Sequence, residues 1–345
     1  MYSSSNPFKG KVFHDYEHED VYMGVVIDYR GKVSPCSGNK ELEANKKKVL
    51  KSGPDDNVFL FFSGHGGVSF LRLIAEDLHA VELNDILAHM HSKKKYNKMV
   101  LYVEACYSGS LFRNILPPNM GIYVITSAKE DEQSWSIFCT DKDIDTCLAS
   151  EFAYAWTKDS EYHDMKRHTL DQQYEEAKKV TADSHVMKYG EMAMGSLLVG
   201  KFQGHYVLPM HRSDGTIPRN AVDRKPSCQA HLFPKSRRLM ETATEGEHEN
   251  AWRKLHRATQ LSHIFKETLR DIVVDVTTHH KPTLKGLSKS DELMCFQAVF
   301  DQFRTHCFTI QKVPEVAQHT TRLMELCKAG YEAEILIDSV HNVCS

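Results

Sequence analysis

Two short motifs place reactive side chains directly after apolar runs. Residues 57–67 read NVFLFFSGHGG, so His65 follows one apolar run and stands among glycines. Residues 98–110 read KMVLYVEACYSGS, so Cys106 ends a second run of the same kind. A thiolate attacks carbonyl carbon, and an imidazole returns the proton that the leaving group needs. The pair therefore indicates covalent catalysis at a carbonyl group.

The glycines beside His65 have a chemical use in such a site. They allow a substrate backbone to come close, and they leave the Gly66 N–H available to point into the site. With the Cys106 N–H, it would form a two-donor oxyanion hole. A single cysteine or histidine is more often an inert core residue, so the prediction depends on both motifs occurring together.

Alternating strands and helices must position these residues. Compact apolar runs at 21–27, 57–62, 99–105 and 121–126 are separated by segments such as 81–92, which has one apolar helical face. This pattern predicts an α/β fold with a mostly parallel sheet and helices on both faces. Because ligands bind at the carboxyl ends of such strands, we expect His65 and Cys106 to meet there.

The chain divides into three parts by pattern. Residues 1–205 carry the α/β pattern. Residues 206–247 lose periodicity and collect Pro, Ser, Arg and Lys, which is typical of a linker. In 248–345, apolar residues keep helical spacing, so we expect a small all-helical domain there.

Composition excludes some classes of protein. The 345 residues have a formal net charge of -3, which gives no indication of a nucleic-acid partner. No run of about 20 apolar residues predicts a membrane span, and the first residues, MYSSSNPFKGKVF, show no signal peptide. Four of the nine cysteines lie after residue 290, which indicates either two disulfides in an oxidising compartment or four buried thiols.

Several motifs together resemble one known family. FFSGHGG and YVEACYSGS, followed in order by SHVMKYG, KFQG, SRRLM and FRTHCF, resemble the legumain (asparaginyl endopeptidase) family of the caspase-like clan of cysteine peptidases. The resemblance covers nearly the whole chain. A GPI transamidase shares the His and Cys motifs, but the FRTHCF tail does not resemble it. The family implies a caspase-like fold followed by a helical pro-domain.

The resemblance also implies residue roles. His65 would be the catalytic histidine and Cys106 the nucleophile, with the N–H groups of Gly66 and Cys106 binding the oxyanion. Glu104 and Ser134 would lie beside the S1 pocket, which receives the substrate residue before the cleaved bond. For Glu104 alone, a solvated carboxylate at a strand end is an equal alternative.

The tail would be a pro-domain that covers the active site of a zymogen. The family pairing joins Cys295 to Cys327 and Cys307 to Cys344. Eight of the twenty histidines lie in this tail, and their protonation would repel it as the pH falls; surface histidines without this role are the alternative. The implied partners are peptide substrates, the chain's own pro-domain and cystatin-like inhibitors. The implied location is endo-lysosomal, vacuolar or secreted.

The sequence departs from the family at three places. It begins after the family's first strand and helix, which carry an asparagine that orients the histidine and an arginine that binds the substrate side chain. In CLASEF (147–152), Ser150 stands where the family has an S1 aspartate, so the preference for cleavage after asparagine is in question. SRRLM is followed by Glu241, so we do not expect self-cleavage at that bond, although Asn220 and Asn250 flank the region.

We expect no metal or cofactor. HDYEH (14–18) matches a zinc-peptidase pattern, but its hydrophilic flanks predict no stable helix to hold both histidines. The sequence therefore predicts a legumain-like cysteine endopeptidase that acts through a Cys106 thioester. The alternative is a pseudoenzyme or interaction protein that keeps the two reactive residues and lacks a working S1 pocket.

Overall fold

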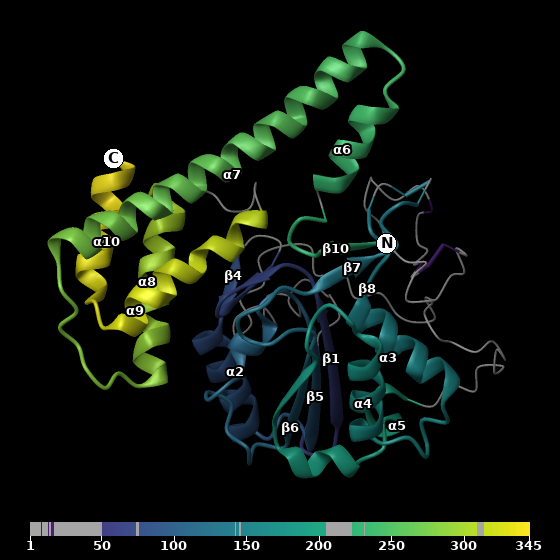
Figure 1. The fold of residues 1–345 in the computed structure, drawn as a ribbon. Helices are drawn as coiled ribbons and strands as arrows, with labels where there is room; N and C mark the ends of the chain where they lie inside the picture. Colours follow the sequence, from purple (N-terminus) through teal and green to yellow (C-terminus); the bar gives the residue numbers. More distant parts are fainter. Residues whose placement is uncertain are drawn as a thin grey trace.

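A computed structural model describes Phe8, Phe13, Asp15, Tyr16 and residues 50–73, 76–141, 143–144, 146–204, 223–230, 232–308 and 314–345. The strand expected at 21–27, and Cys36 and Asn220, lie outside the described residues. So do His14, Glu17 and His18 of the HDYEH motif. The described chain consists of an α/β part followed by a helical part (Figure 1).

The α/β part is built on a four-stranded sheet in the order β1-β5-β6-β9. β1 pairs with β5 and β5 with β6 in parallel, whereas β9 is antiparallel to β6. The strands span β1 (Asn57–Ser63), β5 (Lys98–Glu104), β6 (Ile122–Thr126) and β9 (Met187–Gly190). The sheet is therefore mainly parallel, as the apolar runs predict.

Helices cover both faces of this sheet. Met99, Leu101 and Val103 of β5 belong to one buried cluster with Leu87 of α2 (Ala80–Ser92). The alternate residues of β5 face a second cluster that contains Phe152 of α3 (Glu151–Tyr162) and residues of α4 (Leu170–Val180). Because successive strand residues point to opposite faces, a strand covered on both sides reads as one continuous apolar run. A short helix, α5 (Gly200–Gln203), follows.

Two small sheets stand next to the central one. The first, in the order β2-β3-β4, consists of β2 (Gly66–Gly67), β3 (Phe70–Arg72) and β4 (Asp77–His79). The second, in the order β10-β7-β8, consists of β7 (Trp135–Ile137), β8 (Ala149–Ser150) and β10 (Arg224–Pro226). β10 thus joins a segment from the expected linker to the α/β part.

The helical part consists of α6 (Leu232–Glu241), α7 (Glu245–His279), α8 (Lys289–His306), α9 (Thr321–Ala329) and α10 (Ala333–Cys344). Figure 1 shows the long α7 running from α6 to the group formed by α8, α9 and α10. Phe265, Phe296, Phe300 and Phe303 are fully buried in its core. Disulfides join Cys295 to Cys327 and Cys307 to Cys344, the pairing that the resemblance implies.

Within the expected linker, 206–247, the described residues form β10 and α6. β10 is only three residues long, too short for an alternating pattern to be read from the sequence. α6 buries none of its residues. Within the described residues, no helix is long and apolar enough to cross a membrane. The predicted fold class is confirmed.

Candidate active site

The two reactive residues leave the central sheet at the same edge. β1 and β5 are parallel neighbours, with Ser63 opposite Glu104. The Gly64 N–H donates to the Glu104 carbonyl at 3.1 Å, which continues the pairing past the end of β1. His65 and Cys106 each follow their strand by two residues, so the topology brings both to the carboxyl end of the sheet.

Gly66 packs directly against the backbone at Cys106. A Cβ at this position would lie 2.7 Å from the Cys106 carbonyl oxygen and 3.0 Å from the Ala105 Cβ. Any side chain would therefore push the His65 loop away from the β5 end. The glycine after His65 is required by this close approach, whatever its role toward a substrate.

Cys106 is a buried thiol whose side chain is 1% exposed. Its Sγ lies 3.9 Å from the Ser134 Oγ. A hydrogen bond with the Cys228 thiol is the main cause that lowers the pKa of Cys106; burial acts in the opposite direction. A lowered pKa favours the thiolate, which is the nucleophilic form.

Glu104 is a buried carboxyl group two residues before Cys106. Burial raises its pKa to about 7, although hydrogen bonds with Ser134, Ser150 and Ser127 act in the opposite direction. Its side chain is 3% exposed, so the solvated alternative does not hold for this carboxyl group. Below about pH 7 Glu104 is a neutral acid that can both donate and accept a hydrogen bond. The structure thus brings together Glu104, Cys106, Ser134 and Ser150.

Ser150 also caps a helix. Its Oγ accepts a hydrogen bond from the Ala153 N–H at 3.1 Å, at the start of α3. A serine in this place accepts a hydrogen bond from an N–H group that would otherwise be unpaired at the helix N-terminus. It also lies beside Glu104. A cavity of about 460 Å³ is bordered by both residues, together with His65, Ser136 and Ser227.

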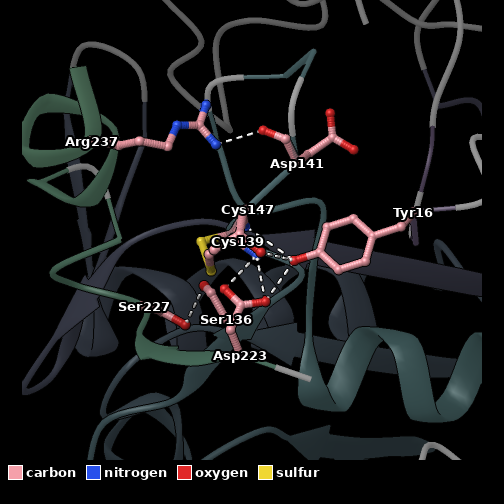
Figure 2. The surroundings of a disulfide bond; sticks show 9 residues. Tyr16, Ser136, Cys139, Asp141, Cys147, Asp223, Ser227 and Arg237 are labelled. Atoms are coloured by element: carbon pink, nitrogen blue, oxygen red, sulfur yellow. Dashed lines mark hydrogen bonds between the residues drawn. A yellow bond between two sulfur atoms is a disulfide. The ribbon is translucent and has the colours of Figure 1, made fainter. Parts of the chain in front are cut away.

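A third disulfide, between Cys139 and Cys147, closes the loop between β7 and β8 beside this cavity. Figure 2 shows the disulfide among residues from three distant parts of the chain. Asp223 accepts hydrogen bonds from the Cys139 N–H at 3.0 and 3.2 Å and from the Tyr16 hydroxyl at 2.6 Å. This disulfide was not predicted from the sequence. The pattern that could have indicated it is two cysteines eight residues apart on either side of the polar stretch TDKDIDT.

Residues 223–230, which we call the 223–230 segment, border this cavity at Ser227 and Ala230. β10 is antiparallel to β7, with Pro226 opposite Trp135. The Ser227 N–H then donates to the Ser134 carbonyl at 2.9 Å. Arg224 anchors the start of the segment, since its Nε lies 2.6 Å from the carboxylate of Glu151, a residue that is 2% exposed. No sequence pattern predicted that this segment would lie at the site.

The helical part contacts the same region. The ring centroids of Phe70 in β3 and Phe300 in α8 lie 4.7 Å apart. Gln133, next to Ser134, donates to the Gln318 side chain at 2.6 Å. Arg304 lies 3.8 Å from Asp77 of β4. The helical part therefore packs on the β2-β3-β4 sheet and reaches the residue beside the site.

One cluster in the described chain has metal-ligating side chains. Asp159, His163 and His168 bring their ligand atoms within 4.8 Å of one another. The two imidazoles stack with an interplanar angle of 8°, so their lone pairs do not converge on one point. Gln173 donates to the Asp159 carboxylate at 2.9 Å. We interpret the cluster as a hydrogen-bonded network around a buried carboxylate.

Comparison with known proteins agrees with this geometry. The model of the peptidase C13 family matches residues 1–205. The chain is 38% identical to a hemoglobinase of Schistosoma mansoni over 99% of this chain and 80% of that protein. It is 33% identical to a legumain of Bos taurus over 99% and 82% of the two chains. A vacuolar-processing enzyme of Arabidopsis thaliana is 29% identical over 100% and 80%. The chain therefore belongs to the peptidase C13 family of cysteine peptidases.

Proposed function

We propose that the protein is an endopeptidase that cleaves peptide bonds through a Cys106–His65 dyad. Cys106 attacks the carbonyl carbon and forms a thioester, while His65 protonates the leaving amine. Water then hydrolyses the thioester, with His65 accepting its proton. The single observation that carries this proposal is the placement of both residues at one edge of neighbouring parallel strands.

The oxyanion of each tetrahedral intermediate would be bound by the N–H groups of Gly66 and Cys106. The contact of Gly66 with the Cys106 carbonyl supports this, because it holds the two backbone segments side by side. Donors fixed in this way stabilise the charge that develops in the transition state. Removing one such donor typically costs a factor of about 10²–10³ in turnover.

The proposed S1 pocket is lined by Glu104, Ser134 and Ser150. A neutral Glu104 offers one donor and one acceptor, which matches the side-chain amide of asparagine. Ser150 supplies a hydroxyl in place of the aspartate that the resemblance implies. We therefore propose uncharged polar residues, asparagine among them, as the preferred residue before the cleaved bond below pH 7. Above pH 7, ionised Glu104 loses its donor and weakens this recognition.

The intact chain is proposed to be a zymogen. The 223–230 segment pairs with β7 and occupies the Ser134 carbonyl, a backbone acceptor that a bound peptide would otherwise use. The Ser227 hydroxyl lies 3.0 Å from that of Ser136, at the border of the S1 cavity. Activity then requires this segment to leave the cleft. An acidic endo-lysosomal or vacuolar setting fits an acid-dependent pocket, and the vacuolar setting is the one that the name of the Arabidopsis thaliana relative supports.

Hydrolysis of a fluorogenic peptide library that varies the residue before the cleaved bond tests the proposal. We expect turnover at pH 5.5 after incubation at acidic pH, with uncharged polar residues preferred. Cys106→Ala is the control and should be inactive. If soluble, folded protein with an emptied cleft turns over no peptide, the proposal fails. The pseudoenzyme alternative, which the Ser150 departure favours, then takes its place.

A further inference from the structure

The described chain contains a second buried thiol next to the nucleophile. Six of the described cysteines form the three disulfides, and the remaining two, Cys106 and Cys228, are thiols. Each is 1% exposed. Cys228 takes no covalent part in peptide hydrolysis by Cys106 and His65. Its position therefore calls for a separate explanation.

Cys228 reaches the site because the 223–230 segment is held in register there. The preceding residue, Ser227, donates its N–H to the Ser134 carbonyl at 2.9 Å. Cys106 lies on the side-chain side of the same residue, with its Sγ 3.9 Å from the Ser134 Oγ. The two cysteines thus lie on either side of Ser134. Cys106 comes from the turn after β5, and Cys228 comes from the 223–230 segment.

The Cys228 side chain is fixed in direction as well as position. Its Sγ donates to the Gln133 Oε1 at 2.9 Å, and Gln133 in turn donates to Gln318 of the helical part. Burial and, after it, the charges of Cys228 and Cys106 raise the pKa of Tyr107 to about 12. The hydrogen bond between the two thiols lowers the pKa of Cys106. Cys106 lies beside Ser134 and Cys228 beside Gln133, and both thiols are buried. Two thiols held next to each other in this way, one of them with a lowered pKa, have the arrangement of a dithiol that oxidises readily.

We propose that Cys228 is a redox modification site that forms a reversible disulfide with Cys106. This inference rests on the proposed role of Cys106 as the nucleophile. The disulfide would tie the 223–230 segment to the reactive sulfur and block it at the same time. The protein would then need reduction, in addition to displacement of the segment, before it could cleave a peptide.

The oxidant is a low-molecular-weight disulfide such as oxidised glutathione. The Cys106 thiolate attacks one of its sulfurs, which breaks that S–S bond and releases one glutathione thiol. The Cys228 thiolate then attacks the Cys106 sulfur of the mixed disulfide and releases the second thiol. The two cysteine protons end on the two released glutathiones. Both cysteines are buried while the 223–230 segment is bound next to β7. The attack of Cys106 on glutathione disulfide therefore occurs while this segment is displaced.

The test equilibrates the full-length chain with glutathione redox buffers of increasing oxidised fraction. Remaining thiols are blocked by an alkylating agent, and a non-reducing digest is read by mass spectrometry. We expect a Cys106–Cys228 linked peptide pair that grows with oxidation. Peptide turnover, assayed after acid incubation, should fall at least tenfold in parallel and return on mild reduction that leaves the other three disulfides intact.

Cys228→Ser is the matched control, since a hydroxyl can keep the bond to Gln133. Once acid incubation has displaced the 223–230 segment, Cys228 no longer contacts Cys106, so this variant should then turn over peptide like the reduced native protein. Under oxidation it should accumulate Cys106 carrying one glutathione. Alkylation of both cysteines at every redox ratio, or a stable glutathione adduct on Cys106 in the native sequence, would overturn the proposal. The linked peptides are measured without any turnover. A linked pair in a protein that never cleaves peptides would therefore refute the proposed function and leave the disulfide standing.

Discussion

The two parts of the molecule bury different kinds of side chain. The α/β part buries ionisable groups, among them Glu104 and Glu151. From residue 232 onward, the buried polar side chains of the described chain are only Thr320 and Ser339, set in a core of phenylalanine and aliphatic residues. Burying an ionisable group costs free energy of folding, whereas burying apolar surface contributes to it. The α/β part thus contains the residues of the proposed reaction, and the helical part adds apolar core and two disulfides.

The contact between the two parts should depend on α8 most strongly. Phe300 packs on Phe70 of β3, whereas Phe303, one turn further along, packs on Phe265 within the helical part. Truncating either residue to alanine should lower the free energy of unfolding of the helical part by about 3–5 kcal/mol. Only Phe300→Ala should also raise amide hydrogen exchange at β3. Equal exchange in both variants would show that α8 does not hold the two parts together.

Removal of disulfides should separate stability from activity. Replacing Cys295 and Cys327 by serine opens a loop with a sequence separation of 32 and should cost about 3–4 kcal/mol in thermal unfolding of the helical part. Turnover by acid-treated protein should stay near the native value. Replacing Cys139 and Cys147 opens a separation of 8, costs about 2–3 kcal/mol and should lower turnover, because that loop borders the S1 cavity. A reversed order of these effects would contradict the division of roles.

The buried carboxyl of Glu104 should make stability depend on pH. Its pKa is about 7 in the folded chain against 4.5 for an ordinary glutamate, so the folded state keeps the proton to a higher pH than the unfolded state does. Stability should therefore fall between about pH 4.5 and 7, by about 3 kcal/mol. Glu104→Gln should remove this fall, as denaturant unfolding at several pH values would reveal. An unchanged slope would mean that Glu104 is already ionised at acidic pH.

A small effect is expected at the contact between His79 and Asp301. Their side chains approach to 3.7 Å, and Arg304 lies 3.5 Å from the same carboxylate. The interaction with His79 is the first cause that lowers the pKa of Asp301. The stabilisation is present above the ordinary pKa of aspartate and is lost as the pH falls through the lowered value. Because Asp301 is 41% exposed, Asp301→Asn should cost less than about 1 kcal/mol at pH 7 in the same unfolding assay. A larger loss in the free energy of unfolding would mean that this pair supplies much of the stability of the contact between the α/β and helical parts.

The sequence was informative where the signal is local. Apolar runs predicted the central strands. The glycines around His65 predicted room for a substrate backbone, and the structure shows that Gly66 also packs against the backbone of Cys106. The C-terminal cysteines indicated disulfides. The position of Cys228 could not be predicted, because β10 is three residues long and pairs with a strand about ninety residues away. Nor does any pattern show that the Ser127 hydroxyl hydrogen-bonds to the backbone of Ala105, since that contact depends on the pairing of β5 with β6.

The most direct measurement treats the acid-incubated protein with an electrophilic peptide probe and locates the modified residue by mass spectrometry. The account predicts modification at Cys106, slowed at least about 100-fold in His65→Ala because the imidazole no longer assists the thiol. The probe should react more slowly with protein kept at pH 7, where the 223–230 segment stays in the cleft. Modification at Cys228 with Cys106 untouched, or equal rates with and without His65, would contradict the claim that these two residues form the reaction centre.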